Sequence, residues 1–167
     1  MATYIVRRAT LADAATLVRH RIRMFEDMGT LSATDAQAGR LAEEFRVWLE
    51  STMPADTYVA WLVEDTDAPA DAPQESRLVA GGGATIIPWP PGPRYVSGRL
   101  AFVYNVYTEP AHRGLGLARR VMEAVHDFCR EAHIDSVALN ASEFGEPLYA
   151  SMGYTVARSP MMFLSLD

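Results

Sequence analysis

A glycine-rich turn that joins an apolar strand to an amphipathic helix is the feature that most constrains the fold of this chain. Residues 99–107 are rich in β-forming side chains, and the turn RGLGLA follows at residues 113–118. A helix that begins at such glycines leaves backbone N–H groups pointing at one place, where the helix dipole adds positive potential. The sequence therefore predicts an anion site at this turn. The helix is indicated by apolar residues at helical spacing, namely Leu117, Val121, Ala124, Val125, Phe128 and Ala132.

The turn does not match the dinucleotide-binding fingerprint G-x-G-x-x-G. Arg119 occupies the position of the third glycine, and no chain-initial strand leads into the turn. A doubly wound nucleotide-binding fold is therefore disfavoured. Glycines also serve purely structural turns before helices, so the turn taken alone leaves both interpretations open.

Strand and helix patterns follow one another along the rest of the chain. Helical spacing begins near Thr10 and stops near Gly29, and Thr34 or Asp35 is predicted to cap a second helix that ends before Pro54. A short helix is predicted between Glu146 and Gly153. Strands are predicted at residues 3–8, 57–63, 77–87, 99–107, 136–140 and 161–166, with a bulge or close backbone approach at Gly81, Gly82 and Gly83.

The basic residues exclude several classes of enzyme. All 15 of them are arginine, and the chain contains no lysine. A Walker-type phosphate loop, a pyridoxal Schiff base and a lysine nucleophile all require lysine. The net charge of −6 is also a poor match for the phosphate backbone of nucleic acids, so no nucleic-acid partner is expected.

No signal for export or membrane insertion is found. The N-terminus lacks an apolar segment of signal-peptide length, and no run approaches the roughly 20 apolar residues of a membrane span. We expect a cytoplasmic protein of one domain, residues 1–167, with no membrane partner. The single cysteine, Cys129, excludes an internal disulfide and is predicted to be a buried core thiol, and no cluster of metal-ligand spacing is present. Edge strands near the C-terminus favour a homodimer.

Two segments carry a resemblance to a known family. The turn at residues 113–118 resembles the cofactor motif Q/R-x-x-G-x-G/A of the GNAT superfamily of N-acetyltransferases, and LYASMGY at residues 148–154 resembles its L-Y-x-x-x-G-F/Y segment. The two occur in the family's order and spacing. The resemblance implies an α+β (or α/β) GNAT fold, in which a mixed, mostly antiparallel sheet of about six to seven strands carries about four helices on its two faces.

The resemblance also implies acetyl-CoA or coenzyme A as cofactor. Backbone amides of the turn would hold the pyrophosphate, main-chain groups at Val106 and Thr108 would align the pantetheine arm, and the thioester would lie where the strands 99–107 and 136–140 part. The cofactor-binding residues implied are Val106, Thr108, Arg113, Gly114, Leu115, Gly116, Leu117, Ala118, Arg119, Asn140, Ser142 and Tyr149.

Catalytic roles follow from the same resemblance. Tyr149 matches the tyrosine that often protonates the leaving thiolate, and a phenol pKa near 10 suits that role. Many relatives carry a carboxylate base where this chain has Asn105, which cannot take a proton and is predicted to orient a water or the acceptor. Glu109 lies too close to the turn to replace it. The function implied is transfer of an acetyl group from acetyl-CoA to a primary amine of a small molecule or peptide, by direct attack in a ternary complex. The alternative is a non-catalytic acyl-CoA sensor.

The chain departs from the family pattern after its fifth strand. Ser142 stands where an asparagine is common, and Gly145 replaces an alanine. Asn140 can supply the missing contact if the strand continues, because alternation would then put Asn140 and Ser142 on one face.

The acceptor is expected to be selected by the first two helices and the loop between them. Met24, Phe25, Glu26 and Met28 are the candidate substrate-binding residues. Glu26 and Asp27 can attract an ammonium group, whereas Arg19, Arg21 and Arg23 can bind a carboxylate or phosphate. Charges at these spacings also form an ordinary solvated helix face, and the sequence does not separate these interpretations.

Overall fold

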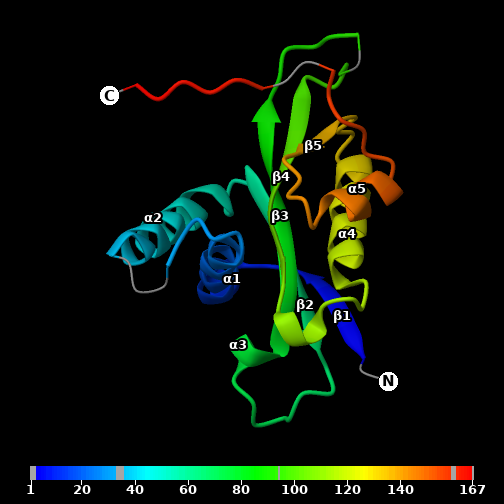
Figure 1. Ribbon diagram of the computed structural model, residues 1–167. Coiled ribbons are helices and arrows are strands. Elements are labelled where there is room, and N and C mark those ends of the chain that lie inside the picture. The colour runs from blue at the N-terminus through cyan, green and yellow to red at the C-terminus, as the bar shows by residue number, and fades with distance from the viewer. Residues whose placement is uncertain (1–2, 33–35, 94, 159–160, 167) are drawn as a thin grey trace.

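The fold is built on a five-stranded sheet in which the strands lie in chain order. The computed structural model describes residues 3–32, 36–93, 95–158 and 161–166. The first four strands form an antiparallel meander, and the last pairs with its neighbour in parallel (Figure 1). The strands are β1 (Tyr4–Arg8), β2 (Tyr58–Asp65), β3 (Leu78–Pro88), β4 (Arg99–Thr108) and β5 (Val137–Leu139).

Helices cover both faces of the sheet, as the GNAT resemblance implied (Figure 1). One face carries α1 (Ala14–Asp27) and α2 (Ala36–Thr52), and the other carries α4 (Leu117–Glu131) with α5 (Glu146–Ser151). A single-turn helix, α3 (Gln74–Arg77), lies between β2 and β3, and the short helices η1 (Leu11–Asp13) and η2 (Pro110–His112) precede α1 and follow β4. Thr34 and Asp35, the predicted caps of α2, lie outside the described residues.

Two apolar clusters, one on each face of the sheet, hold the layers together. Under α4 the cluster includes Val121, Val125 and Val63, and under α1 and α2 it includes Leu49 and Leu62. Strand β2 runs between the two, so its first six residues are all buried, which explains its continuous rather than alternating apolar pattern.

A β-bulge interrupts the pairing of β3 with β4. Gly81 pairs with Tyr107 and Gly83 with Tyr104, so Asn105 and Val106 together oppose Gly82. The predicted irregularity at the three glycines is confirmed, and the extra residue belongs to β4. Asn105 takes a left-handed conformation with φ of 59°, which asparagine tolerates better than most side chains.

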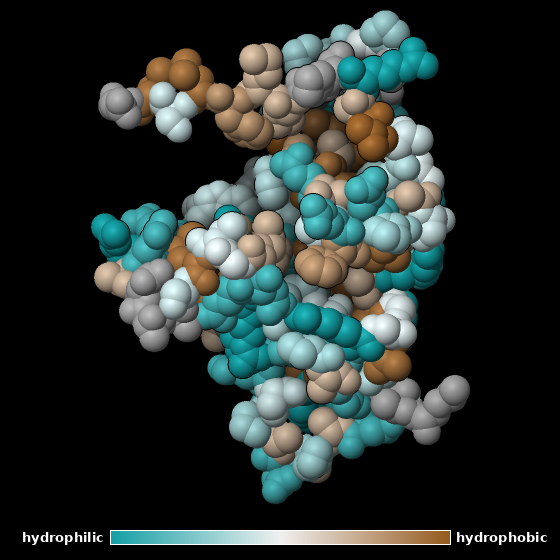
Figure 2. All heavy atoms as spheres, viewed as in Figure 1, coloured by the Kyte–Doolittle hydropathy of each residue, from teal (hydrophilic) through white to brown (hydrophobic). Residues whose placement is uncertain are grey.

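The C-terminal strand predicted at residues 161–166 is not formed. These residues make no strand pairing, and Phe163 and Leu166 are 83% and 87% exposed. The sheet therefore has five described strands instead of six to seven. A β-forming segment becomes a strand only where a sheet edge of matching register lies within reach. Figures 1 and 2 show this segment extending away from the body with its hydrophobic side chains uncovered.

No helix of the described residues is long and apolar enough to cross a membrane.

Replacing Gly83 by alanine is predicted to destabilise the fold. A Cβ at this position would overlap the hydroxyl of the buried Tyr58 and would lie 2.6 Å from the carbonyl oxygen of Val59. Overpacking of this kind costs about 1–3 kcal/mol, which urea unfolding would measure.

Gly39→Ala is the matched control, because an added Cβ there meets nothing within 4 Å inside helix α2. It should raise the free energy of unfolding by about 0.5–1 kcal/mol through helix propensity. Equal effects of the two substitutions would contradict the close approach at Gly83.

Candidate functional site

Strands β4 and β5 part at a defined point. Their pairing runs from Ala101 with Val137 to Val103 with Leu139, where β5 ends. Strand β4 continues to Thr108 without a described partner on that side. The expectation that these two strands separate is confirmed. Tyr104 and Asn105 are the first residues of β4 beyond the last pair, so they lie where the sheet opens.

The RGLGLA turn exposes a group of backbone donors. Gly114 and Gly116 have φ of 76° and 75°, and a Cβ on either would meet nothing within 4 Å. The glycines are therefore required for their left-handed backbone and not for packing. Gly116 directly precedes α4 and provides no side-chain cap. The N–H groups of residues 114–118 donate to no acceptor in the described part of the chain. Five backbone donors without a described acceptor are thus grouped at the positive end of the helix dipole, an arrangement typical of an anion site.

The arginines of the turn are tied to neighbouring elements. Nε of Arg113 donates to the carbonyl oxygen of Thr108 at 2.9 Å, and its guanidinium pairs with Asp27 at the end of α1. Arg113 therefore fixes the turn against β4 and α1. Nη2 of Arg119 donates to Oγ of Ser151 at 2.6 Å, which links α4 to α5. The predicted contact of Arg119 with a phosphate stays a prediction.

Tyr149 lies on α5 beside the second tyrosine of its motif. The rings of Tyr149 and Tyr154 meet edge to face with centroids 5.8 Å apart. A Cβ on Gly145 would lie 2.9 Å from the Tyr149 ring, so the ring packs directly against this glycine. Burial raises the pKa of the Tyr149 hydroxyl, so the residue is protonated at neutral pH and able to donate.

Asn105 is held rigidly at the point where the strands part. It is 8% exposed, its amide nitrogen donates to the Tyr58 hydroxyl at 3.3 Å, and its Oδ1 accepts a hydrogen bond from Nη1 of Arg21. Burial raises the pKa of Tyr58 to about 12, so Tyr58 stays neutral. Sequence reasoning missed this link, because nothing in the spacing of residues 21, 58 and 105 signals contact.

Two arginines of α1 pair with the Glu109 carboxylate, which is therefore not free to act as a base. Its oxygens accept from Nη1 of Arg23 at 2.5 and 2.6 Å, and Nε of Arg19 lies 3.6 Å away. His20 Nε2 lies 3.8 Å from the same carboxylate and 3.2 Å from the carbonyl oxygen of Leu78. Desolvation, reinforced by Arg19, lowers the pKa of His20 to about 4, so its ring is neutral at pH 7. This cluster was not anticipated from the sequence.

The strand does not continue far enough to place Asn140 and Ser142 on one face. Strand β5 ends at Leu139, and Ser142 forms a turn in which its carbonyl oxygen accepts from the N–H groups of Gly145 and Glu146 at 3.0 and 2.9 Å. Strand alternation therefore does not relate the two residues. Asn140 is exposed directly beyond the parting point, and its contact with the cofactor stays a prediction.

The candidate acceptor residues are only partly brought together. Phe25 packs its ring 5.0 Å from the Arg21 guanidinium, and Phe45 of α2 approaches from the other helix at 4.7 Å. Met24 and Glu26 are half-buried, whereas Met28 is 52% exposed beyond the end of α1.

Cys129 is buried in the core as predicted, and burial raises the pKa of its thiol to about 11.

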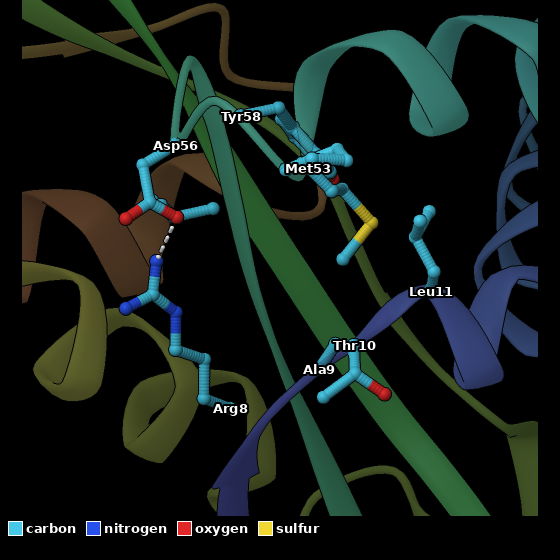
Figure 3. Close-up of a pocket in the computed structure, with 9 residues that line it drawn as sticks. Arg8, Ala9, Thr10, Leu11, Met53, Asp56 and Tyr58 are labelled. Carbon is cyan, nitrogen blue, oxygen red and sulfur yellow. Dashed lines mark hydrogen bonds and ion pairs between the residues drawn. The ribbon is translucent and has the colours of Figure 1, made fainter.

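Two cavities lie beside these elements. The first, of about 370 Å³, is drawn in Figure 3 between the end of β1 and the segment that joins α2 to β2. Leu11 and Met53 line it, and so do Arg8 and Asp56, which pair at 2.6 Å. The second, of about 580 Å³, is lined by Glu109, His112 and the two arginines that neutralise Glu109. Neither includes the donors of the RGLGLA turn. No cluster of metal-ligating side chains occurs among the described residues.

The chain resembles acetyltransferases in sequence and in fold. The Acetyltransferase (GNAT) family model matches residues 25–154. A GCN5-related N-acetyltransferase from Ralstonia eutropha JMP134 superposes with a TM-score of 0.79 at 27% identity, covering 97% of this chain and 99% of that one. A predicted acetyltransferase with acetyl-CoA from Clostridium acetobutylicum has a TM-score of 0.80 at 24% identity, covering 99% of this chain and 96% of that one. Glucosamine-6-phosphate N-acetyltransferase from Arabidopsis thaliana has a TM-score of 0.67 at 20% identity, covering 99% of each chain. A search of curated proteins finds no match.

The buried His20 predicts a pH dependence of stability. Its folded pKa of about 4 lies below the ordinary value of 6.5, so the unfolded chain binds a proton in this window and the folded chain does not. The free energy of unfolding should fall by about 3 kcal/mol more in the wild type than in His20→Gln as the pH drops from 6.5 to 4. Denaturant unfolding at several pH values would measure the difference.

The exposed His133, replaced by asparagine to suit its φ of 54°, is the control. If the free energy of unfolding changed with pH in parallel for the wild type and His20→Gln, His20 would not be held neutral by the fold.

Proposed function

The chain belongs to the acetyltransferase (GNAT) family, and from this premise we propose that it transfers an acetyl group from acetyl-CoA to a primary amine of a small molecule or peptide. The acceptor attacks directly while both substrates are bound. The open backbone donors of the RGLGLA turn carry this proposal.

The turn fits the pyrophosphate of coenzyme A. Five N–H groups, at Gly114, Leu115, Gly116, Leu117 and Ala118, lack protein acceptors, and the open space at both glycines leaves room for phosphate oxygens. A structural relative with 24% sequence identity is described with acetyl-CoA. The presence of this ligand on the same fold supports acetyl-CoA as the cofactor of the proposed reaction.

The free stretch of β4 fits the pantetheine arm. Beyond Val103 the strand has no described partner on the side of β5, so main-chain groups at Val106 and Thr108 can pair with an extended ligand. This path runs from the turn to the point where the strands part. The reacting thioester then lies beside Asn105.

Acetyl-CoA supplies an activated thioester, and its transfer to the amine forms one N–C bond and breaks one C–S bond. The amine nitrogen loses a proton and the thiolate gains one. Tyr149, kept protonated by burial, donates the proton to sulfur and takes one back from water, which restores the phenol. Asn105 cannot act as base; its rigid amide orients the acceptor or a water, and the amine loses its proton to water.

A non-catalytic acyl-CoA sensor is the second candidate. It is favoured by the amide of Asn105 at the position where a base is expected, and by the neutralisation of Glu109. The two candidates share the cofactor site and differ only in turnover.

Thermal-shift titration and a thiol-release screen test the proposal in sequence. Acetyl-CoA and coenzyme A should each raise the melting temperature, whereas NADH should not. Stabilisation by NADH alone would refute the cofactor site. Stabilisation without thiol release from any amine in a broad library would favour the sensor.

Tyr149→Phe is predicted to lower kcat by about 100-fold while coenzyme A still raises the melting temperature, because Phe keeps the ring and loses only the hydroxyl that acts on the leaving group. Tyr154→Phe is the matched control; its hydroxyl contacts His126 at 2.7 Å and has no assigned role in transfer. Full activity of Tyr149→Phe would exclude Tyr149 as the proton donor.

A further inference from the structure

Arg21 is a half-buried cation on the α1 side of the sheet. Its guanidinium lies between the rings of Phe25 and Phe45, at 5.0 and 4.7 Å, and Nη1 donates to the Oδ1 of Asn105. Its Nε is buried without an acceptor in the described part of the chain. Arginine stays protonated in proteins, so a full positive charge is held among aromatic rings and a neutral amide.

The neighbouring arginines of α1 differ from Arg21 in their partners. Arg23 forms an ion pair with Glu109 at 2.5 Å, and Arg19 lies within 3.6 Å of the same carboxylate and 3.8 Å of Glu75. No carboxylate of the described residues forms an ion pair with Arg21. A buried charge without a counter-charge is costly, and contact with two aromatic rings compensates for only part of that cost. Among the described residues, Arg19 and Arg23 each have a carboxylate partner and Arg21 has none.

The location of Arg21 relates it to the acceptor and not to the coenzyme. It reaches Asn105, the residue at which β4 loses its pairing with β5, from the face that carries α1 and α2. The RGLGLA donors lie at the start of α4, which covers the opposite face (Figure 1). An anion bound by Arg21 would thus lie beside the reacting centre, on the side away from the pyrophosphate site.

We propose that the amine acceptor also carries an anionic group, a carboxylate or a phosphate, and that Arg21 binds this group. The inference rests on the proposed acetyl transfer and names the substrate class of the same site. Guanidinium pairs with both anions through charge-assisted hydrogen bonds and discriminates strongly against a neutral analogue. The acceptor is then a zwitterion, such as an amino acid or an amino phosphate ester, and its amine is the group acetylated.

Matched pairs of amines test the proposal. Thiol release is compared for phenylalanine and phenethylamine, and for phosphoethanolamine and ethanolamine, so the two pairs separate carboxylate from phosphate. In at least one pair the anionic member should have a kcat/KM higher by about 10- to 100-fold. In Arg21→Met the ratio of the two kcat/KM values should fall towards one, beyond any loss that both members share through the Asn105 contact, and Arg21→Lys should restore part of the ratio.

Arg46→Met is the control, because Arg46 is an exposed arginine of α2 paired with Glu43 and Glu50. Thermal shifts with coenzyme A show whether each variant is folded and keeps its cofactor site. Equal use of both members of every pair by the wild type would overturn the proposal. An equal loss on both members in Arg21→Met would also overturn it, because Arg21 would then only position Asn105.

Calorimetric titration of the same amines into protein saturated with coenzyme A measures their binding directly, so it tests the anion site without requiring acetylation. If no amine is acetylated but the anionic members bind and lose binding in Arg21→Met, the transfer reaction fails and the anion site stands. If acetylation occurs without an anionic preference, the transfer reaction stands and the anion site fails. Absence of binding by every anionic member would overturn the inference as well.

Discussion

The β-bulge opposite Gly82 is the constraint on which the site depends. It places one extra residue in β4, and that residue, Asn105, takes a left-handed backbone conformation two residues after the last pair between β4 and β5. The bulge aims the Asn105 amide at Tyr58 and Arg21, while the close approach at Gly82 and Gly83 admits no larger side chain without movement. One backbone irregularity therefore sets both the opening of the sheet and the chemistry beside it.

In the proposed reaction the two substrates bind to different kinds of groups on different faces of the sheet. The proposed donor site consists mainly of N–H groups at the start of α4, whose positions depend on two glycines with positive φ. The proposed acceptor site consists of side chains from α1, α2 and β4 around Arg21. A site made of backbone groups depends on a short local motif, so the proposed cofactor site can be predicted from the sequence. Side-chain recognition across distant elements leaves no such motif.

Much of the fold, and the geometry of the turn, could be predicted from the sequence, because they depend on local patterns. Periodicity located α1, α2 and α4, Pro147 and Gly153 marked the short helix α5, and the glycines marked the bulge and the turn. The prediction of a strand at residues 161–166 was wrong, because strand formation requires a partner edge, which β-propensity alone does not reveal. The Arg21–Asn105 and His20–Glu109 contacts join residues 84 and 89 positions apart, so only the folded structure brings them together.

The central claim is that the RGLGLA backbone binds the pyrophosphate of coenzyme A while β4 aligns the pantetheine arm. Amide chemical-shift mapping of ¹⁵N-labelled protein during titration with coenzyme A tests it most directly. The account predicts the largest shifts at the amides of residues 114–118, with smaller shifts at Val106 and Thr108. Unchanged amides in the turn, with the main shifts around the Arg8–Asp56 cavity, would contradict it.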